Sequence, residues 1–114
     1  MSESETVLII DDEEDACVLW TAFLASLNLK VFTAANIRDG LRSVEQFRPD
    51  VVFLDNNLPD GLGWEYVDHI RSILPDCKIN LISAYHYDAS PWLGKNVRVF
   101  EKPLSLSMIR AALV

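Results

Sequence analysis

The sequence predicts an α/β domain built on a doubly wound, five-stranded parallel sheet with helices on both faces. Short apolar runs of strand length alternate along the chain with stretches of helical periodicity. Right-handed crossovers through helices are expected to connect the parallel strands, and the strand order 2-1-3-4-5 is predicted because it is a common doubly wound arrangement. With 114 residues the chain has room for one such domain, over residues 1–114, and is too short for two.

The predicted strands are the runs 6–10, 30–35, 51–55, 78–83 and 97–101. The third, VVFLD, begins with four apolar residues, a pattern typical of a strand buried on both faces. It ends in Asp55, before a turn-rich loop that contains Asn57, Pro59 and Gly61. Ligands of open α/β sheets bind at the carboxyl ends of the strands, which makes Asp55 a candidate site residue. An Asp after a strand also commonly begins a turn, so the residues that end the other strands must show whether Asp55 belongs to a site.

The predicted helices cover about 16–27, 37–48, 64–74 and a short segment near the C-terminal end. The first is apolar nearly all round, so part of its surface could form a homodimer or bind a partner. The acids at 13–15 are interpreted as a solvated helix start. Asn36 is expected to cap the second helix, and Ser105 or Ser107 the last. Segment 85–96 contains proline and glycine without a clear apolar period, so the fourth helix of the expected pattern is predicted to be reduced to a loop or a single turn.

The composition argues against several classes of protein. A net charge of −7 disfavours direct binding of nucleic acid, because phosphate contacts need clusters of lysine and arginine. No apolar run reaches about 18 residues, so no membrane association is expected. The polar start MSESET does not resemble a signal peptide, and a cytoplasmic location is predicted. Cys17 and Cys77 are then expected to be reduced thiols.

Polar side chains stand where four of the five predicted strands end. Asp11 and Asp12 follow the first strand, and Asp55 ends the third. Ser83 ends the fourth strand and Lys102 follows the fifth. The first and third strands are neighbours in the predicted order, so three carboxylates would crowd one edge, which is costly unless a cation neutralises them. Mg²⁺ suits oxygen ligands and phosphate, and the set therefore predicts a site for phosphoryl transfer to a carboxylate.

This ordered set resembles the receiver domain of two-component response regulators, and the resemblance covers the whole chain. The matching residues are Asp11-Asp12, Asp55 within LDNNLPDGLG, Ser83-Ala84 and Lys102-Pro103. The resemblance implies a flavodoxin-like fold similar to that of the chemotaxis regulators. It further implies that Asp55 accepts a phosphoryl group from a histidine kinase or phosphotransfer protein. Such a domain is a phospho-acceptor with slow self-dephosphorylation, not an enzyme.

The resemblance also implies roles for the other site residues. It implies a Mg²⁺ site formed by Asp12, Asp55, the backbone carbonyl of Asn57 and, through water, Asp11. Lys102 would pair with Asp55 and then with the phosphoryl oxygens, while Ser83 would turn to donate a hydrogen bond to them. These movements would bias a surface that binds a downstream protein. The Lys102-Pro103 bond is commonly cis in this family.

One position departs from the family pattern. Receivers usually carry Tyr or Phe three residues before the lysine of the fifth strand, and this chain has Val99 there. Phe100 follows, but strand alternation points it to the other side of the sheet. The usual aromatic coupling is therefore not expected, and output is predicted through the first helix or the segment 85–96. Asn57 and Tyr85 are the candidates for setting the lifetime of the acyl phosphate.

Two other functions remain open on the sequence alone. One is a receiver-like protein-interaction domain that works without phosphorylation, which the reduced fourth helix and Val99 favour. The other is a phosphatase of the haloacid-dehalogenase class, which also uses an Asp nucleophile. Those enzymes place a general-acid Asp two residues after the nucleophile, where this chain has Asn57, and they carry a cap domain.

Overall fold

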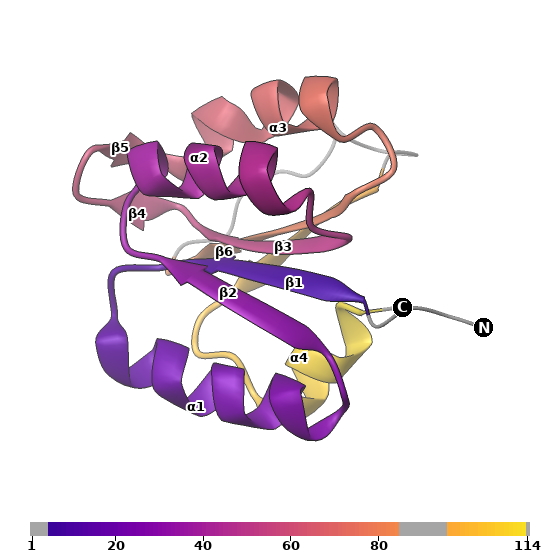
Figure 1. The fold of residues 1–114 in the computed structure, drawn as a ribbon. Coiled ribbons are helices and arrows are strands. Elements are labelled where there is room, and N and C mark those ends of the chain that lie inside the picture. Colours follow the sequence, from indigo (N-terminus) through magenta and orange to yellow (C-terminus); the bar gives the residue numbers. More distant parts are fainter. Residues whose placement is uncertain (1–4, 85–95, 114) are drawn as a thin grey trace.

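The protein is described by a computed structural model that covers residues 5–84 and 96–113, and a central sheet lies between two layers of helices (Figure 1). The sheet has five parallel strands in the order β2-β1-β3-β6-β7, which confirms the predicted order because β6 and β7 are its fourth and fifth strands along the chain. These strands are β1 Thr6–Ile10, β2 Lys30–Ala34, β3 Val51–Asp55, β6 Lys78–Ser83 and β7 Val97–Glu101.

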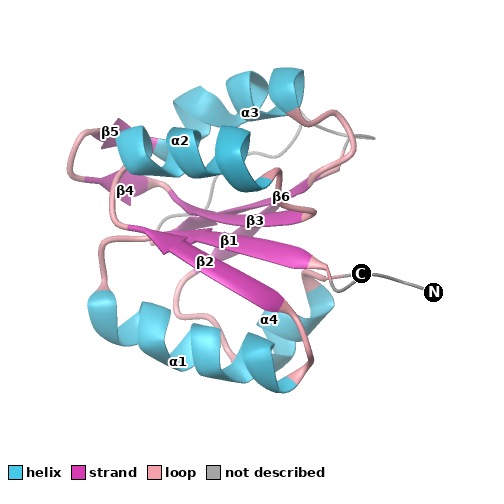
Figure 2. Cartoon of the chain, viewed as in Figure 1, coloured by secondary structure: helices cyan, strands magenta, loops and turns pink. Residues whose placement is uncertain are grey.

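The helices cover both faces of the sheet, as the sequence predicts (Figure 2). On one face lie α1 Glu14–Ser26 and α4 Leu106–Ala111. On the other lie α2 Ile37–Phe47, the 3₁₀ turn η1 Gly63–Tyr66 and α3 Val67–Ile73. The helix predicted to be reduced, between the fourth and fifth strands of the sheet, falls at 85–96, of which residues 85–95 lie outside the described part of the chain.

The strand β3 is buried over its whole length, which confirms the interpretation of its apolar run. Val52 and Leu54 belong to the core cluster under α2 and α3, whereas Val51 and Phe53 belong to the cluster under α1 and α4. Alternate residues of the strand therefore fill opposite cores, as period-two side-chain geometry requires. Such a strand has no solvated face, and its only polar side chain is that of Asp55 at its carboxyl end.

Helix α1 is apolar around most of its circumference, and only part of that surface is covered. Trp20 and Leu24 are buried against the sheet. Val18 is 65% exposed and Leu19 is 57% exposed. The helix starts at Glu14, two residues before the predicted start at 16. The exposed side chains agree with the predicted partner or dimer surface, which stays a prediction.

The segment after β3 differs from the prediction of one continuous helix over 64–74. It first forms a two-stranded antiparallel pair, β4 Asn57–Leu58 and β5 Gly61–Leu62, and then the 3₁₀ turn η1. Trp64, predicted in register with the buried residues, is 41% exposed. The Trp64 amide donates to the side-chain oxygen of Asn56, eight residues earlier, so the start of the helix is bound to the loop.

The predicted helix caps are borne out at two places. The Asn36 side chain accepts from the Asp39 amide at 2.7 Å and caps α2. The Ser105 hydroxyl accepts from the Met108 amide and caps α4. Caps of this kind satisfy amides that the first helical turn leaves without partners.

The aromatic side chain near the end of β7 points away from the side where receivers carry their switch residue. Val99 packs against the cluster under α2 and α3, while Phe100 packs against the cluster under α1 and α4. The strand alternation expected from the sequence is thus present. The Lys102-Pro103 peptide bond is cis.

Both cysteines are free thiols. Burial raises the pKa of Cys17 to about 11 and the pKa of Cys77 to about 12, so both stay protonated near neutral pH. No helix within the described residues combines the length and the apolar character that spanning a bilayer needs.

Candidate functional site

Three carboxylates converge at the carboxyl edge of the sheet. Asp11 and Asp12 follow β1, Asp55 ends β3, and one oxygen of each lies within 4.8 Å of the others. β1 and β3 are paired in parallel, with Ile10 opposite Leu54, so adjacent strands deliver these acids to one point. Asp11 is 3% exposed and Asp55 is 2% exposed, whereas Asp12 faces solvent.

The charges in this cluster oppose one another. Burial raises the pKa of Asp11 to about 6, and nearby Asp55 also raises it, against the hydrogen bond from the Glu13 amide. Burial likewise raises the pKa of Asp55, while Lys102 and the Asn57 amide oppose the shift. The protein thus holds two buried acids in a setting that disfavours their ionised forms. Strongly shifted acids in one place are typical of functional sites.

Lys102 joins the cluster from the end of β7. Its Nζ lies 3.3 Å from Asp55 Oδ1 and 3.2 Å from Glu13 Oε1. Burial alone would lower the pKa of Lys102, but Asp55, Glu13 and Asp11 outweigh burial and raise it. The Lys102 amide donates to the Ser83 carbonyl at 2.7 Å, which ties the ends of β7 and β6 together.

Glu13 corrects the interpretation of residues 13–15 as only a solvated helix start. Its carboxylate pairs with Lys102, and its amide donates to Asp11 Oδ1 at 2.9 Å. The partners Glu13 and Lys102 are 89 residues apart, and no local pattern could have linked them. Its position directly after the two site acids was the only hint in the sequence.

Ser83 and Asn57 lie near Asp55, the first at the end of the neighbouring strand and the second in the segment that follows β3. Ser83 is fully buried at the end of β6, next in sequence to Ile82, which pairs with Asp55. Asn57 is exposed, and its amide donates to Asp55 Oδ1 at 3.3 Å. Tyr85, predicted together with Asn57 to set the lifetime of the acyl phosphate, lies outside the described residues.

Asn56 is a further site residue that sequence reasoning did not find. It is fully buried, and its amide donates to the Ile82 carbonyl at 2.8 Å. Its carbonyl accepts from Gly63, and its side-chain oxygen accepts from Trp64. A Cβ on Gly63 would meet the Asp55 carbonyl oxygen at 2.5 Å, so glycine allows the loop to close there. The run Asn56-Asn57 alone gave no sign of which side chain turns inward.

The carboxylate oxygens of this cluster are suitable ligands for a hard divalent cation. Among the described residues no group donates a hydrogen bond to the buried oxygen Asp11 Oδ2. An unpartnered buried carboxylate oxygen is costly, and it stands here beside two further carboxylates. Oxygen-only ligands with room for water match the preferences of Mg²⁺.

The family comparison agrees with this geometry. A family model described as the response regulator receiver domain matches residues 7–113. Sporulation initiation phosphotransferase F of Bacillus subtilis is 29% identical and covers 96% of this chain, which spans 90% of that protein. Sensor histidine kinase AtsR of Burkholderia thailandensis is 29% identical over 90% of this chain, which spans only 18% of that protein.

Solved structures share the arrangement of strands and helices. A two-component response regulator from Clostridium difficile matches with a TM-score of 0.84 and 27% identity, over 96% of this chain and 93% of that one. A CheY-like receiver domain protein from Methanospirillum hungatei matches with a TM-score of 0.87 over 97% of this chain and 91% of that one. At 21% identity, the second match supports the fold alone.

Proposed function

Since the chain belongs to the response regulator receiver domain family, we propose that Asp55 is the residue on which it accepts a phosphoryl group. The domain is a phosphoryl-accepting module of two-component signalling. One observation carries the assignment of the residue: of the three carboxylates in the cluster, Asp55 is the one that forms an ion pair with Lys102, at 3.3 Å, and it ends the central strand of the sheet. Asp11 and Asp12 lie next to it, at the end of the neighbouring strand β1.

The reaction follows from the groups at this edge. A carboxylate oxygen of Asp55 attacks the phosphorus of a phosphohistidine, an O–P bond forms, and the P–N bond breaks. The electron pair leaves with the imidazole nitrogen, which is neutralised by a proton. Receiver domains take the group from histidine kinases or phosphotransfer proteins, and we assign this chain a donor of that kind. The ammonium of Lys102 stabilises the charge that moves onto the phosphoryl oxygens.

Asp12, Asp55 and the backbone carbonyl of Asn57 would hold Mg²⁺, with Asp11 acting through water. When bound, the ion supplies positive charge that offsets the carboxylates and the transferring phosphoryl group. The orphaned Asp11 Oδ2 supports this assignment because a metal-bound water could donate to it. The same positive charge favours the ionised form of Asp55 that nucleophilic attack needs.

Phosphorylation would then change the ends of β6 and β7. The Ser83 hydroxyl and Lys102 Nζ gain phosphoryl oxygens as acceptors, and the Lys102 amide already binds the Ser83 carbonyl. Movement of one strand end is therefore passed to the other. We assign the output to a protein-binding surface for a downstream protein, and a homodimer and a cytoplasmic location stay predictions.

The test uses Mg²⁺ with acetyl phosphate as the phosphoryl donor and beryllofluoride as a mimic. We expect a one-to-one adduct by intact mass with the donor and a saturable fluorescence change with the mimic. Both should vanish in Asp55→Asn. Asp68→Asn is the matched control, since it removes the same charge from an exposed position on α3 and should behave as the native chain.

The other two functions predict different results. A domain that works without phosphate gives no adduct with either reagent. A phosphatase releases phosphate from a phosphomonoester over many turnovers, whereas a receiver shows only slow self-dephosphorylation. An adduct that persists in Asp55→Asn would reject Asp55 as the acceptor.

A further inference from the structure

The tip of the β4–β5 pair is anchored to a helix that is distant in sequence. Asp60 lies in the turn between these strands, and its carboxylate accepts two backbone hydrogen bonds from the first turn of α2. Oδ1 accepts from the Ile37 amide at 2.8 Å, and Oδ2 accepts from the Arg38 amide at 3.0 Å. A bidentate carboxylate at a helix N-terminus combines two charge-assisted bonds with the favourable helix dipole.

We propose that Asp60 is a positioning residue for the metal site: by holding the tip of the β4–β5 pair on α2, it fixes the backbone of Asn57 beside Asp55. This inference rests on the proposed function, in which the Asn57 carbonyl is a ligand of Mg²⁺. It assigns a task to a residue that touches neither the ion nor the phosphoryl group.

The connection between Asp60 and Asn57 is short and stiff. Asn57 pairs with Leu62 and Leu58 pairs with Gly61, so the segment is a hairpin closed by a two-residue turn. At its base, Asn56 holds the chain through hydrogen bonds to Ile82, Gly63 and Trp64. Because Asn56 holds the base of the hairpin and Asp60 holds its tip, the backbone of Asn57 has little freedom to move.

The close approach of the hairpin tip to α2 requires glycine at position 61. Gly61 has φ +153°, and a Cβ there would meet the Ile37 side chain at 3.0 Å. Glycine therefore lets the turn lie against the same residue whose amide binds Asp60. The pKa of Asp60 is lowered, because the amides of Ile37 and Arg38 stabilise its carboxylate.

A purely structural explanation is that Asp60 only caps α2. The helix already has a local cap, because the Asn36 side chain accepts from the Asp39 amide. Asp60 supplies acceptors for the amides of Ile37 and Arg38 from another element, 23 and 22 residues away. The two explanations differ in whether loss of Asp60 reaches the metal site.

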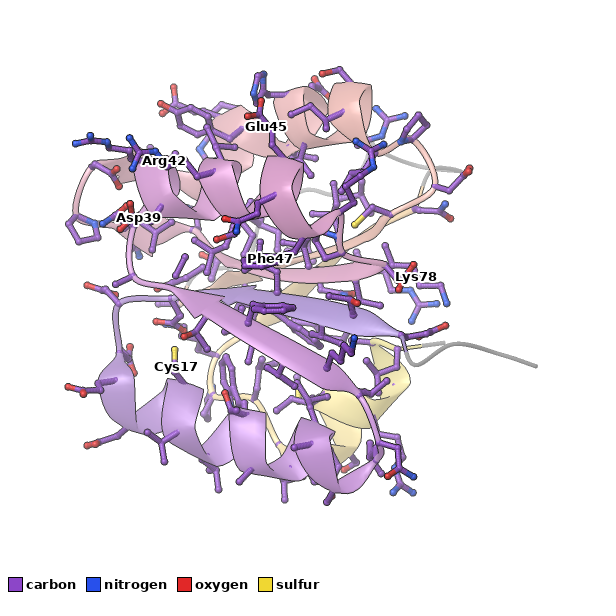
Figure 3. The ribbon with its side chains drawn as sticks, viewed as in Figure 1. Cys17, Asp39, Arg42, Glu45, Phe47 and Lys78 are labelled. Atoms are coloured by element: carbon purple, nitrogen blue, oxygen red, sulfur yellow. The ribbon has the colours of Figure 1, made fainter. Side chains whose placement is uncertain are left out.

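The experiment compares Asp60→Ala and Asp60→Asn with the native chain and with Asp39→Asn. Asp39 is an acid in the first turn of the same helix (Figure 3), and its carboxylate accepts from the Asn36 side chain, so its loss removes a charge there without touching the hairpin. Mg²⁺ affinity is measured by titration, and the amide exchange of Asn57 is measured in metal-free protein. Asp60→Asn keeps one strong acceptor and serves as the milder variant if Asp60→Ala folds poorly.

We expect Asp60→Ala to weaken Mg²⁺ binding about tenfold and Asp60→Asn to weaken it less, while Asp39→Asn leaves it unchanged. The Asn57 amide should exchange faster in both Asp60 variants without metal. If Asp39→Asn weakens Mg²⁺ binding equally, the effect comes from the loss of charge alone. If the Asp60 variants lose stability but keep their Mg²⁺ affinity, Asp60 is only a helix cap. Either result overturns the inference. If the native chain fails to bind Mg²⁺, the proposed function fails, and unchanged Asn57 exchange would separately reject the positioning role.

Discussion

The two ends of the central sheet treat polar groups in opposite ways. At the carboxyl end, Asp11, Asp12 and Asp55 crowd together, and a buried oxygen of Asp11 lacks a partner among the described residues. At the amino end, donors from β6 and β7 meet the carbonyls of residues 111–113 at the end of α4. These donors are Lys78 at 3.0 Å, Asn80 at 3.3 Å and Arg98 at 2.9 Å.

We interpret this difference as a division between groups that stabilise the fold and groups that would bind the proposed Mg²⁺. The final carbonyls of a helix have no partners within it, and the amino end supplies three, two of them cations that suit the negative end of the helix dipole. The carboxyl end instead keeps like charges together, which lowers stability unless something binds. We therefore expect mutations at the amino end to change stability and mutations at the carboxyl end to change metal binding.

The largest effect is expected for Asp12→Asn. Asp12 is an exposed carboxylate in the cluster, and its loss should weaken Mg²⁺ binding about 100-fold, or about 2.7 kcal/mol. Titration followed by tryptophan fluorescence would measure it. Asp15→Asn, which removes an exposed acid from the first turn of α1, should leave the affinity within about twofold if the effect is local. Equal losses in the two variants would contradict a specific ligand role.

The next effect concerns stability at the opposite end. Asn80→Ala removes a buried donor to Ala112 and leaves that carbonyl without it, so we expect a loss of about 2 kcal/mol in the free energy of unfolding. Urea denaturation of metal-free protein would measure this change. Mg²⁺ affinity should not change, and the exposed Asn96→Ala should cost less than about 0.5 kcal/mol. A lower Mg²⁺ affinity in Asn80→Ala would contradict the proposal that the two ends of the sheet have separate roles.

Asp11→Asn should stabilise the metal-free protein, by about 1–2 kcal/mol above pH 6. Folding raises the pKa of Asp11 from 3.8 to about 6, so the folded carboxyl keeps its proton over a range where the unfolded one has lost it. Its contribution to stability therefore falls as pH rises from 3.8 to about 6 and stays unfavourable above that. Below pH 3.8 both states are protonated, and the variant should gain little.

Urea denaturation of both proteins across that pH range would measure the gain. A gain that does not depend on pH would point to packing instead of ionisation. Saturating Mg²⁺ should shrink the difference, because the ion offsets the same charge in the native protein.

The smallest effect is expected for Lys78→Met, at about 0.5–1 kcal/mol of stability. Lys78 lies at the far end of the sheet from the β4–β5 pair (Figures 1 and 3) and donates to the Leu113 carbonyl. The loss should diminish at high salt, since screening weakens the interaction of a part-exposed cation with the helix end. Lys30→Met, at an exposed position that starts β2, changes the same charge and should have less effect on thermal denaturation.

Much of the fold could be predicted because its signals are local. Four of the five predicted strands match the structure residue for residue, and the second ends one residue early. Apolar runs of this length leave few alternatives once helical stretches separate them. The β4–β5 pair was missed because a two-residue strand has no periodicity to detect, and the 3₁₀ start of the third helix was missed because Asn56 causes it from outside the helix.

The candidate site could be predicted only in part. Asp11, Asp12, Asp55 and Lys102 stand at strand ends, and the structure brings them together as the predicted order requires. The sequence predicts a solvated helix start at 13–15 and a turn-rich loop after Asp55, and it does not indicate the contacts that Glu13, Asn56 and Asp60 make. Each of these three acts through a partner that a local pattern does not indicate.

The sequence by itself determined which residues end the strands and therefore which polar groups could reach one edge, because the apolar alternation along a chain specifies strands and their limits. Only the tertiary structure decided how those groups are held: the pairing of Lys102 with Glu13 across 89 residues, the inward turn of Asn56, and the grip of Asp60 on α2. These contacts join segments distant in sequence, and their geometry depends on strand pairing and helix packing, which no short stretch of residues encodes.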